Sequence, residues 1–279
     1  MSTPVPMSTP VPMSDPAPAI TPVAGPVTLA RVVRSEWTKF RSLRSTWWSL
    51  AVTVVAAVGL GVLASALAAG ARAPSTVPVT VAGRSELGGL ISQLAVGVLA
   101  VLFISGEYGT GMIRSSMIAV PRRLPVLTAK MGVFAAAALP VTLASTLGAY
   151  GLGELAWTAH GRPAVSLSDP GVARVVFGAA ACIVLTGLCA LAIGTLVRST
   201  AGGLTTMVGL FFVLPILAGM MPERIADLSR FLPTNASGAV WNSSLSPVSM
   251  TPASGFALLC GYTVVLCAAA AWRLRRGDV

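Results

Sequence analysis

The sequence predicts an all-α membrane protein with six transmembrane helices, a preceding interfacial amphipathic helix, and cytoplasmic N- and C-termini. Of its 279 residues, 54% are hydrophobic and only 10% are charged. Soluble domains carry roughly 25% charged residues, so a soluble enzyme or binding module is excluded. Several long stretches contain no charge, and each holds the roughly 20 apolar residues that a helix needs to cross a bilayer. These stretches do not alternate in polarity, which favours helices over a β-barrel.

Residues 1–26 predict a disordered, Pro-rich cytoplasmic tail. Residues 1–18 form a near-exact six-residue repeat, with copies that begin at Met1, Met7 and Met13. Proline recurs too often for a helix or a strand, and the apolar core of a signal peptide is missing. The repeat is compatible with a spacer, with a docking motif, or with a translation start at Met7 or Met13.

Residues 27–46 predict a basic amphipathic helix that lies in the inner membrane interface. At about 100° per residue, its apolar side chains share one arc and most of its arginines lie on the other side. Glu36 falls inside the apolar arc, where a lone carboxylate is costly. We therefore expect Glu36 to meet Lys39, Arg44 or a cation on a partner. The residues of interest on this helix are Glu36, Trp37, Lys39 and Phe40.

The gaps between charged residues define six transmembrane spans. They are residues 47–69, 88–105, 131–153, 172–197, 203–221 and 255–272, and a basic cytoplasmic tail follows at 273–279. We expect no ionisable side chain well inside a span, with Glu107 and Glu154 at span ends that water reaches. With the N-terminus inside, 13 of the 19 basic residues lie in cytoplasmic segments. This bias predicts the orientation, because cytoplasmic loops are enriched in Lys and Arg.

Small residues and prolines predict how two of the spans pack or bend. The first span carries small residues at four-residue spacing, at Ala57, Gly61, Ser65 and Ala69. Such an array lets two helices approach closely, either within the chain or across a dimer. Pro140 and Pro215 predict bends in the third and fifth spans.

The residue types that catalysis, metal binding and nucleotide binding require are missing or badly spaced. The sequence has no Gly-Lys dipeptide, so it has no phosphate-binding G-x-x-x-x-G-K-[ST] loop. The single histidine, His160, is expected to be a solvated loop residue, and the four cysteines fit neither a disulfide within one helix nor a zinc site. We predict no catalytic residue, no bound metal or cofactor, and no nucleic-acid partner.

The segment between the second and third spans has the clearest signal for a partner. Glycines follow Glu107 at once, and a short helix at about 110–120 should end at Pro121. Met112 and Met117 fall on one face of that helix, and methionine-bearing exposed faces suit docking of another protein. The alternative is a helix that lies on the membrane.

Two motifs resemble the membrane subunit of a type-2 ABC transporter, the bacterial exporter-like permease family. One is R-S-E-W-T-K-F-R-S-L-R-S-T-W-W at 34–48, and the other is E-Y-G-T-G-x-I-R at 107–114, followed by P-R-R and a lysine. The resemblance covers about residues 28–279. It implies that residues 106–130 form the loop that couples to the ATPase, and the family pattern matches at Glu107, Gly109, Thr110, Arg114 and Arg122.

The resemblance also implies the partners and the activity. A second permease copy or a homologous permease would complete the pathway, and separate ABC ATP-binding subunits would hydrolyse ATP, so the chain itself is not expected to be an enzyme. Located in the bacterial cytoplasmic membrane among its lipids, the complex would export a lipid, an antibiotic or another amphipathic compound. Residues 225–231 are expected to form a short external turn. The alternatives are a solo channel, a regulatory membrane scaffold, and an intramembrane enzyme built on Ser92, Gln93 or Thr186.

Overall fold

The described part of the chain is an all-helical bundle in which six helices are long and apolar enough to cross a membrane. The structure, a computed structural model, describes residues 28–70, 81–109, 124–222, 228–241 and 250–276, with the backbone alone for 81–87. Within these ranges there is no strand. The predicted N-terminal tail, the predicted helix at 110–120 and residues 225–227 of the predicted 225–231 turn lie outside the described residues.

The helices follow the order predicted from the apolar runs. A short helix, α1 (Leu29–Ser42), precedes the bundle, and Thr28 caps it by accepting a hydrogen bond from the backbone N–H of Arg31. The candidate spans are α2 (Arg44–Gly70), α3 (Val81–Gly109, apolar from Gly88), α5 (Leu124–Thr158), α6 (Val172–Val197), the continuous α7–η1–α8 (Thr200–Val208, Gly209–Val213 and Leu214–Gly219), and α11 (Pro252–Arg276). A further short helix, α10 (Pro233–Trp241), precedes α11.

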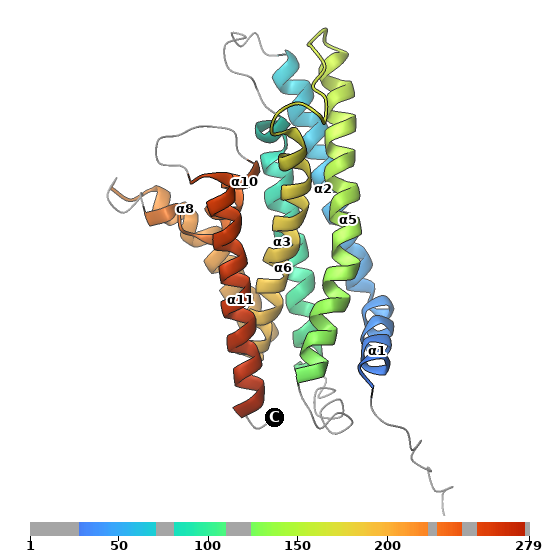
Figure 1. Cartoon of the computed structure of the whole chain (residues 1–279), viewed down its shortest axis with the longest axis vertical. Coiled ribbons are helices and arrows are strands. Elements are labelled where there is room, and N and C mark those ends of the chain that lie inside the picture. Colours follow the sequence, from blue (N-terminus) through green and yellow to red (C-terminus); the bar gives the residue numbers. More distant parts are fainter. Residues whose placement is uncertain (1–27, 71–80, 110–123, 223–227, 242–249, 277–279) are drawn as a thin grey trace, which may run out of the picture.

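Successive spans run in alternating directions along the bundle. Figure 1 shows α1 at the same end of the molecule as the C-terminal end of α11. The last turn of α3 and the first turns of α5 lie at this end as well. Residues that are far apart in the sequence therefore meet around α1.

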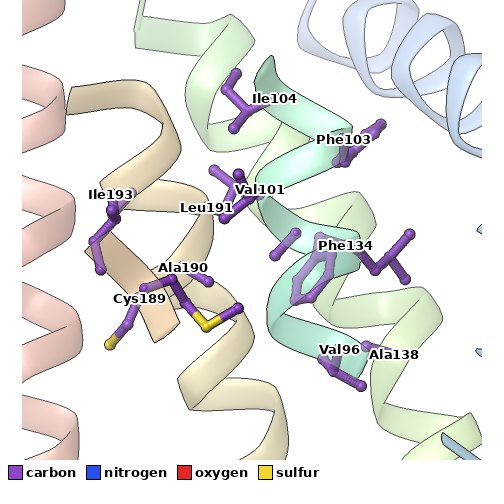
Figure 2. Packing of buried hydrophobic residues seen from close by; sticks show 14 of the residues in the cluster. Val96, Val101, Phe103, Ile104, Phe134, Ala138, Cys189, Ala190, Leu191 and Ile193 are labelled. Carbon is purple, nitrogen blue, oxygen red and sulfur yellow. The ribbon is translucent and has the colours of Figure 1, made fainter. Parts of the chain in front are cut away.

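The centre of the bundle is α6, of which 67% is buried, against 17% of the Thr200–Gly219 span. Figure 2 shows Phe134 of α5 with Val96 and Ile104 of α3 where these helices meet α6. Glycines on α6 make this contact close, because a Cβ on Gly187 would lie 2.5 Å from Cζ of Phe134. Such packing resembles that of other protein interiors, where even one added methyl group destabilises the fold.

The small residues of α2 pack within the chain. All four are buried, and α2 lies against α3 and α5. A Cβ on Gly61 would lie 3.1 Å from Cβ of Ala149, and one on Gly153 would lie 2.8 Å from Oγ of Ser65. Close approach of α2 and α5 thus depends on these small side chains. Of the two possibilities that the sequence left open, the structure supports packing between helices of one chain.

Pro215 is accompanied by a change of helix type. It follows the π-helical turn η1, in which the N–H of Leu214 donates to the carbonyl of Gly209. Because proline has no N–H, the carbonyl of Phe211 loses its usual donor four residues on. The hydroxyl of Thr234 on α10 donates to this carbonyl instead. Pro140, by contrast, lies inside α5, which continues as one helix on both sides of it.

Candidate functional site

Four charged side chains from three helices form a closed ring of ion pairs at the α1 end of the bundle. Lys39 Nζ lies 2.7 Å from Glu36 Oε1 and 2.8 Å from Glu107 Oε1. Lys130 Nζ lies 2.6 Å from Glu36 Oε2 and 3.1 Å from the same oxygen of Glu107. Each lysine thus bridges both carboxylates, and α1, α3 and α5 are joined through polar contacts.

Helical spacing brings the α1 members of the ring into position. Val32, Glu36 and Phe40 recur every four residues, so they share one face of α1, and all three are buried. Val32 packs against Val126 and Ala129 of α5. This contact places Glu36 beside Lys130, which follows Ala129 in the chain. The face that the sequence assigned to the membrane is therefore partly a protein contact.

Aromatic rings close the site from the side of the bundle. Lys130 Nζ lies 4.0 Å from the centre of the Phe103 ring, within the range of a cation–π interaction. Phe40 meets Phe103 edge to face, with ring centres 5.0 Å apart. These contacts and the 2% exposure of Glu36 leave little access for water.

Charge balance makes this burial tolerable. Two carboxylates face two ammonium groups, and an isolated buried charge would be far more costly than a paired one. Burial of Lys39 lowers its pKa, but its hydrogen bonds to Glu107 and Glu36 and their negative charges outweigh this, so the pKa is raised above its ordinary value. Lys39 therefore stays charged at neutral pH. The second carboxylate oxygen of Glu107, Oε2, is buried and has no hydrogen-bond partner among the residues that the structure describes.

Four of the predicted site residues meet in this cluster. Glu36, Lys39, Phe40 and Glu107 lie together, and Gly109 ends α3 directly after the cluster. Trp37 is 39% exposed on another side of α1, where its ring stacks on that of Phe40. The remaining predicted residues lie outside the described part of the chain; they are Thr110, Met112, Arg114, Met117 and Arg122.

One expectation about charges was wrong, and one buried charge was not expected. The helix that carries the third span begins at Leu124, so Lys130 lies near the start of this helix, where it is fully buried. Water was expected to reach Glu107, yet this residue is only 7% exposed. The expected partner Lys39 does meet Glu36, but the closest ion pair of Glu36 is with Lys130. The reason is that α5 begins seven residues before the apolar run at 131, and the apolar run alone set the predicted boundary.

A compositional signal could have pointed to Lys130. The chain has 17 arginines but only two lysines, and both lysines are in the ring. Lysine is a compact charge with three donors on a flexible stem, whereas arginine presents a planar fork. A single nitrogen can therefore lie between two carboxylates that come from different helices.

Three other polar side chains that the sequence singled out form structural contacts. Ser92 donates to the carbonyl of Thr53, and the side-chain amide of Gln93 donates to the hydroxyl of Ser237, so neither is paired with an acid or a histidine. His160 is exposed and contacts the carbonyl of Ala156. Within the described residues, no three His, Cys, Asp or Glu side chains could hold a metal together, and all four cysteines are free thiols.

Comparison with protein-family models found no match for this chain. The search of curated proteins likewise found no match. The function is therefore argued from the buried ring and the helices that carry it.

Proposed function

We propose that this chain is the permease subunit of a type-2 ABC exporter that works with separate ATP-binding subunits. Six apolar helices are compatible with a membrane pathway. The absence of a phosphate-binding loop from the sequence agrees with ATP hydrolysis on another chain. The motifs around Glu36 and Glu107 are the two that resemble this family.

The proposed orientation places the ring on the cytoplasmic side of a bacterial cytoplasmic membrane. Basic residues are concentrated near the ring end, on α1 and at the end of α11, where Arg273, Arg275 and Arg276 lie in the last turn. Positive residues stay in the cytoplasm during insertion. In this arrangement α1 lies where the bilayer meets the cytoplasm.

The single observation that carries the proposal is the position of the ring relative to the proposed coupling loop. Glu107 precedes the 110–123 segment and Lys130 follows it, and both bind Glu36 on α1 or its partner Lys39. A force on that segment therefore acts on α1, α3 and α5 together. A coupling element requires that these three helices move together, because separate movement of each helix would dissipate the force.

The mechanism begins with ATP binding, which closes the two partner ATPase subunits. Their movement displaces the coupling loops, and the ring passes this displacement to α1 and to the ends of α3 and α5. A nucleotide can drive the change only if its complex favours one of the two permease states. Cargo then leaves through a pathway shared by two permeases. Apolar spans with few internal polar groups favour a lipid, an antibiotic or another amphipathic cargo.

A pull-down from native membranes tests the proposal. The tagged chain is purified in mild detergent, and ATPase activity is measured in the eluate. We expect a co-purifying ATPase that carries a phosphate-binding loop. Changing Met112 and Met117 together to Asp should abolish its recovery, since two carboxylates on the docking face oppose a hydrophobic contact.

The matched control changes Met220 and Met221 to Asp, because these exposed methionines lie at the end of α8 and away from the ring. This control should retain the ATPase. Absence of any ATPase from wild-type eluates in several mild detergents would contradict the proposal. It would favour a solo channel or a membrane scaffold instead.

A further inference from the structure

A groove between α1 and α5 lies beside the ring and has no role in the proposed function. Its volume is about 470 Å³, and it is open along one side. Leu29, Val33 and Trp37 of α1 form one wall, and Thr128, Gly132 and Ala136 of α5 form the other. None of the four charged residues of the ring lines the groove, so the groove is a separate site.

Helical spacing explains why the groove exists. Thr128, Gly132 and Ala136 recur every four residues and present only small groups, whereas α1 contributes large ones. A Cβ on Gly132 would meet no atom within 4 Å. Leu29 and Val33 are 57% and 39% exposed, so the apolar wall is not covered by other parts of the described chain.

The charge at the groove is positive. Arg34 lines it, and no described acidic side chain forms an ion pair with Arg34. Glu36, which is the acidic residue of α1, is buried and neutralised by Lys39 and Lys130. The groove therefore combines an apolar floor with a guanidinium group that no acidic side chain of the described residues neutralises, and such a group pairs well with a phosphate.

The shape of the groove favours a thin, flexible chain. Its wall on α5 extends over about two helical turns, from Thr128 to Ala136, toward the centre of the membrane span, and it presents only small groups.

We propose that this groove binds an anionic phospholipid, with one acyl chain along Gly132 and Ala136 and the headgroup phosphate at Arg34. The inference rests on the membrane placement of α1 and α5 and not on the ATPase partner. In the cytoplasmic leaflet, anionic headgroups are attracted to such basic segments. The bound lipid would fill the groove beside the direct contact of α1 with α5, so it would help to hold α1 in place.

Native mass spectrometry of the purified full-length chain tests this site. The protein is stripped of lipid, and phosphatidylglycerol or phosphatidylcholine with identical acyl chains is added back. We expect one phosphatidylglycerol to be retained at least fivefold more strongly than phosphatidylcholine. Arg34→Gln should remove this preference, and Gly132→Leu should reduce retention of both lipids, because the new side chain occupies the acyl-chain position.

Matched controls separate the site from general lipid contact. Arg41→Gln removes an exposed arginine from the same helix, and Gly151→Leu adds a side chain elsewhere on α5, where a Cβ also meets nothing within 4 Å. Both should retain phosphatidylglycerol as the wild type does. Ala136→Leu provides a second filling variant if Gly132→Leu is not monodisperse.

Three results would overturn the inference. Equal retention of phosphatidylglycerol and phosphatidylcholine would contradict the proposed contact between Arg34 and an anionic headgroup. Unchanged lipid retention in both Gly132→Leu and Ala136→Leu would show that the groove is not the binding site. Conversion of a dimer to a monomer by Gly132→Leu would show that a second copy occupies it. None of these readouts depends on ATP, so a failure here is distinct from failure of the ATPase pull-down.

Discussion

Lys130 is the side chain on which the buried charges depend. It is fully buried, it bridges Glu36 and Glu107, and it lies over the ring of Phe103. Buried ion pairs are weak evidence for stability, since apolar groups of similar size often replace them without loss. Removal of one partner is different, because it leaves an uncompensated charge. The ring therefore ties the three helices to one arrangement more than it stabilises the fold.

Lys130→Met should destabilise the protein by about 3–5 kcal/mol, the usual range for breaking a buried pair. Two carboxylates would then face only Lys39. Adding Glu36→Gln restores balance, since one carboxylate and one ammonium group remain, so the double variant should be more stable than Lys130→Met alone. Thermal unfolding in detergent, monitored by size-exclusion chromatography, measures the order of stability of the two variants. A double variant less stable than the single one would contradict the role given to charge balance.

The α7–η1–α8 element shows how a proline can be accommodated inside a candidate span. Pro215 leaves the carbonyl of Phe211 without its usual donor, and Thr234 of α10 supplies one. In a bilayer, water cannot satisfy such a group, so neighbouring helices must. The side chain of Phe211 is fully buried, and α10 is also bound to α3 through Gln93 and Ser237. The position of α10 is therefore set by hydrogen bonds on two sides.

Thr234→Val should destabilise the protein by about 1–3 kcal/mol, because it leaves a buried carbonyl without a donor. In a Pro215→Ala background, the new N–H of residue 215 can donate to the carbonyl of Phe211. Thr234→Val should then lower the stability by less. A double-mutant cycle on thermal unfolding measures the difference. Equal losses in both backgrounds would show that the Thr234 hydroxyl does not replace the missing donor.

At the scale of the whole molecule, alternation of the spans places α1 and the C-terminal end of α11 at the same end of the bundle (Figure 1). The loop before α6 lies at the opposite end of the bundle. Ser168 of that loop and Arg275 of α11 are both exposed. The native cysteines should contribute little background in a thiol-labelling experiment, since Cys182 and Cys189 are buried and the other two are only partly exposed.

Ser168→Cys should react with a membrane-impermeant maleimide in intact cells, whereas Arg275→Cys should react only after permeabilisation. The reason is that the arginine-rich end is expected to stay in the cytoplasm. The unsubstituted chain is the control for the native thiols. Labelling of Arg275→Cys in intact cells would reverse the proposed orientation and remove the ring from the ATPase side.

The number, order and approximate ends of the long helices could be predicted from the sequence. In an apolar helix all backbone hydrogen bonds are made within the segment, so a charge-free run of sufficient length predicts a span without knowledge of its neighbours. The same local argument could suggest that Glu36 needs a cation, and it found Lys39 three residues away. Periodicity could likewise mark the small residues of α2, although not the helix they meet.

Only the tertiary structure decided which of these groups meet. Lys130 looked like a loop residue, because an apolar run ends at the first charge, whereas a helix continues while its charges find partners. Those partners, Glu36 and Glu107, lie 94 and 23 residues away, and nothing in local spacing relates them. The helices of this protein follow from segments read one at a time, but its ring and its groove exist only where α1 packs against α5, since both depend on contacts between distant segments.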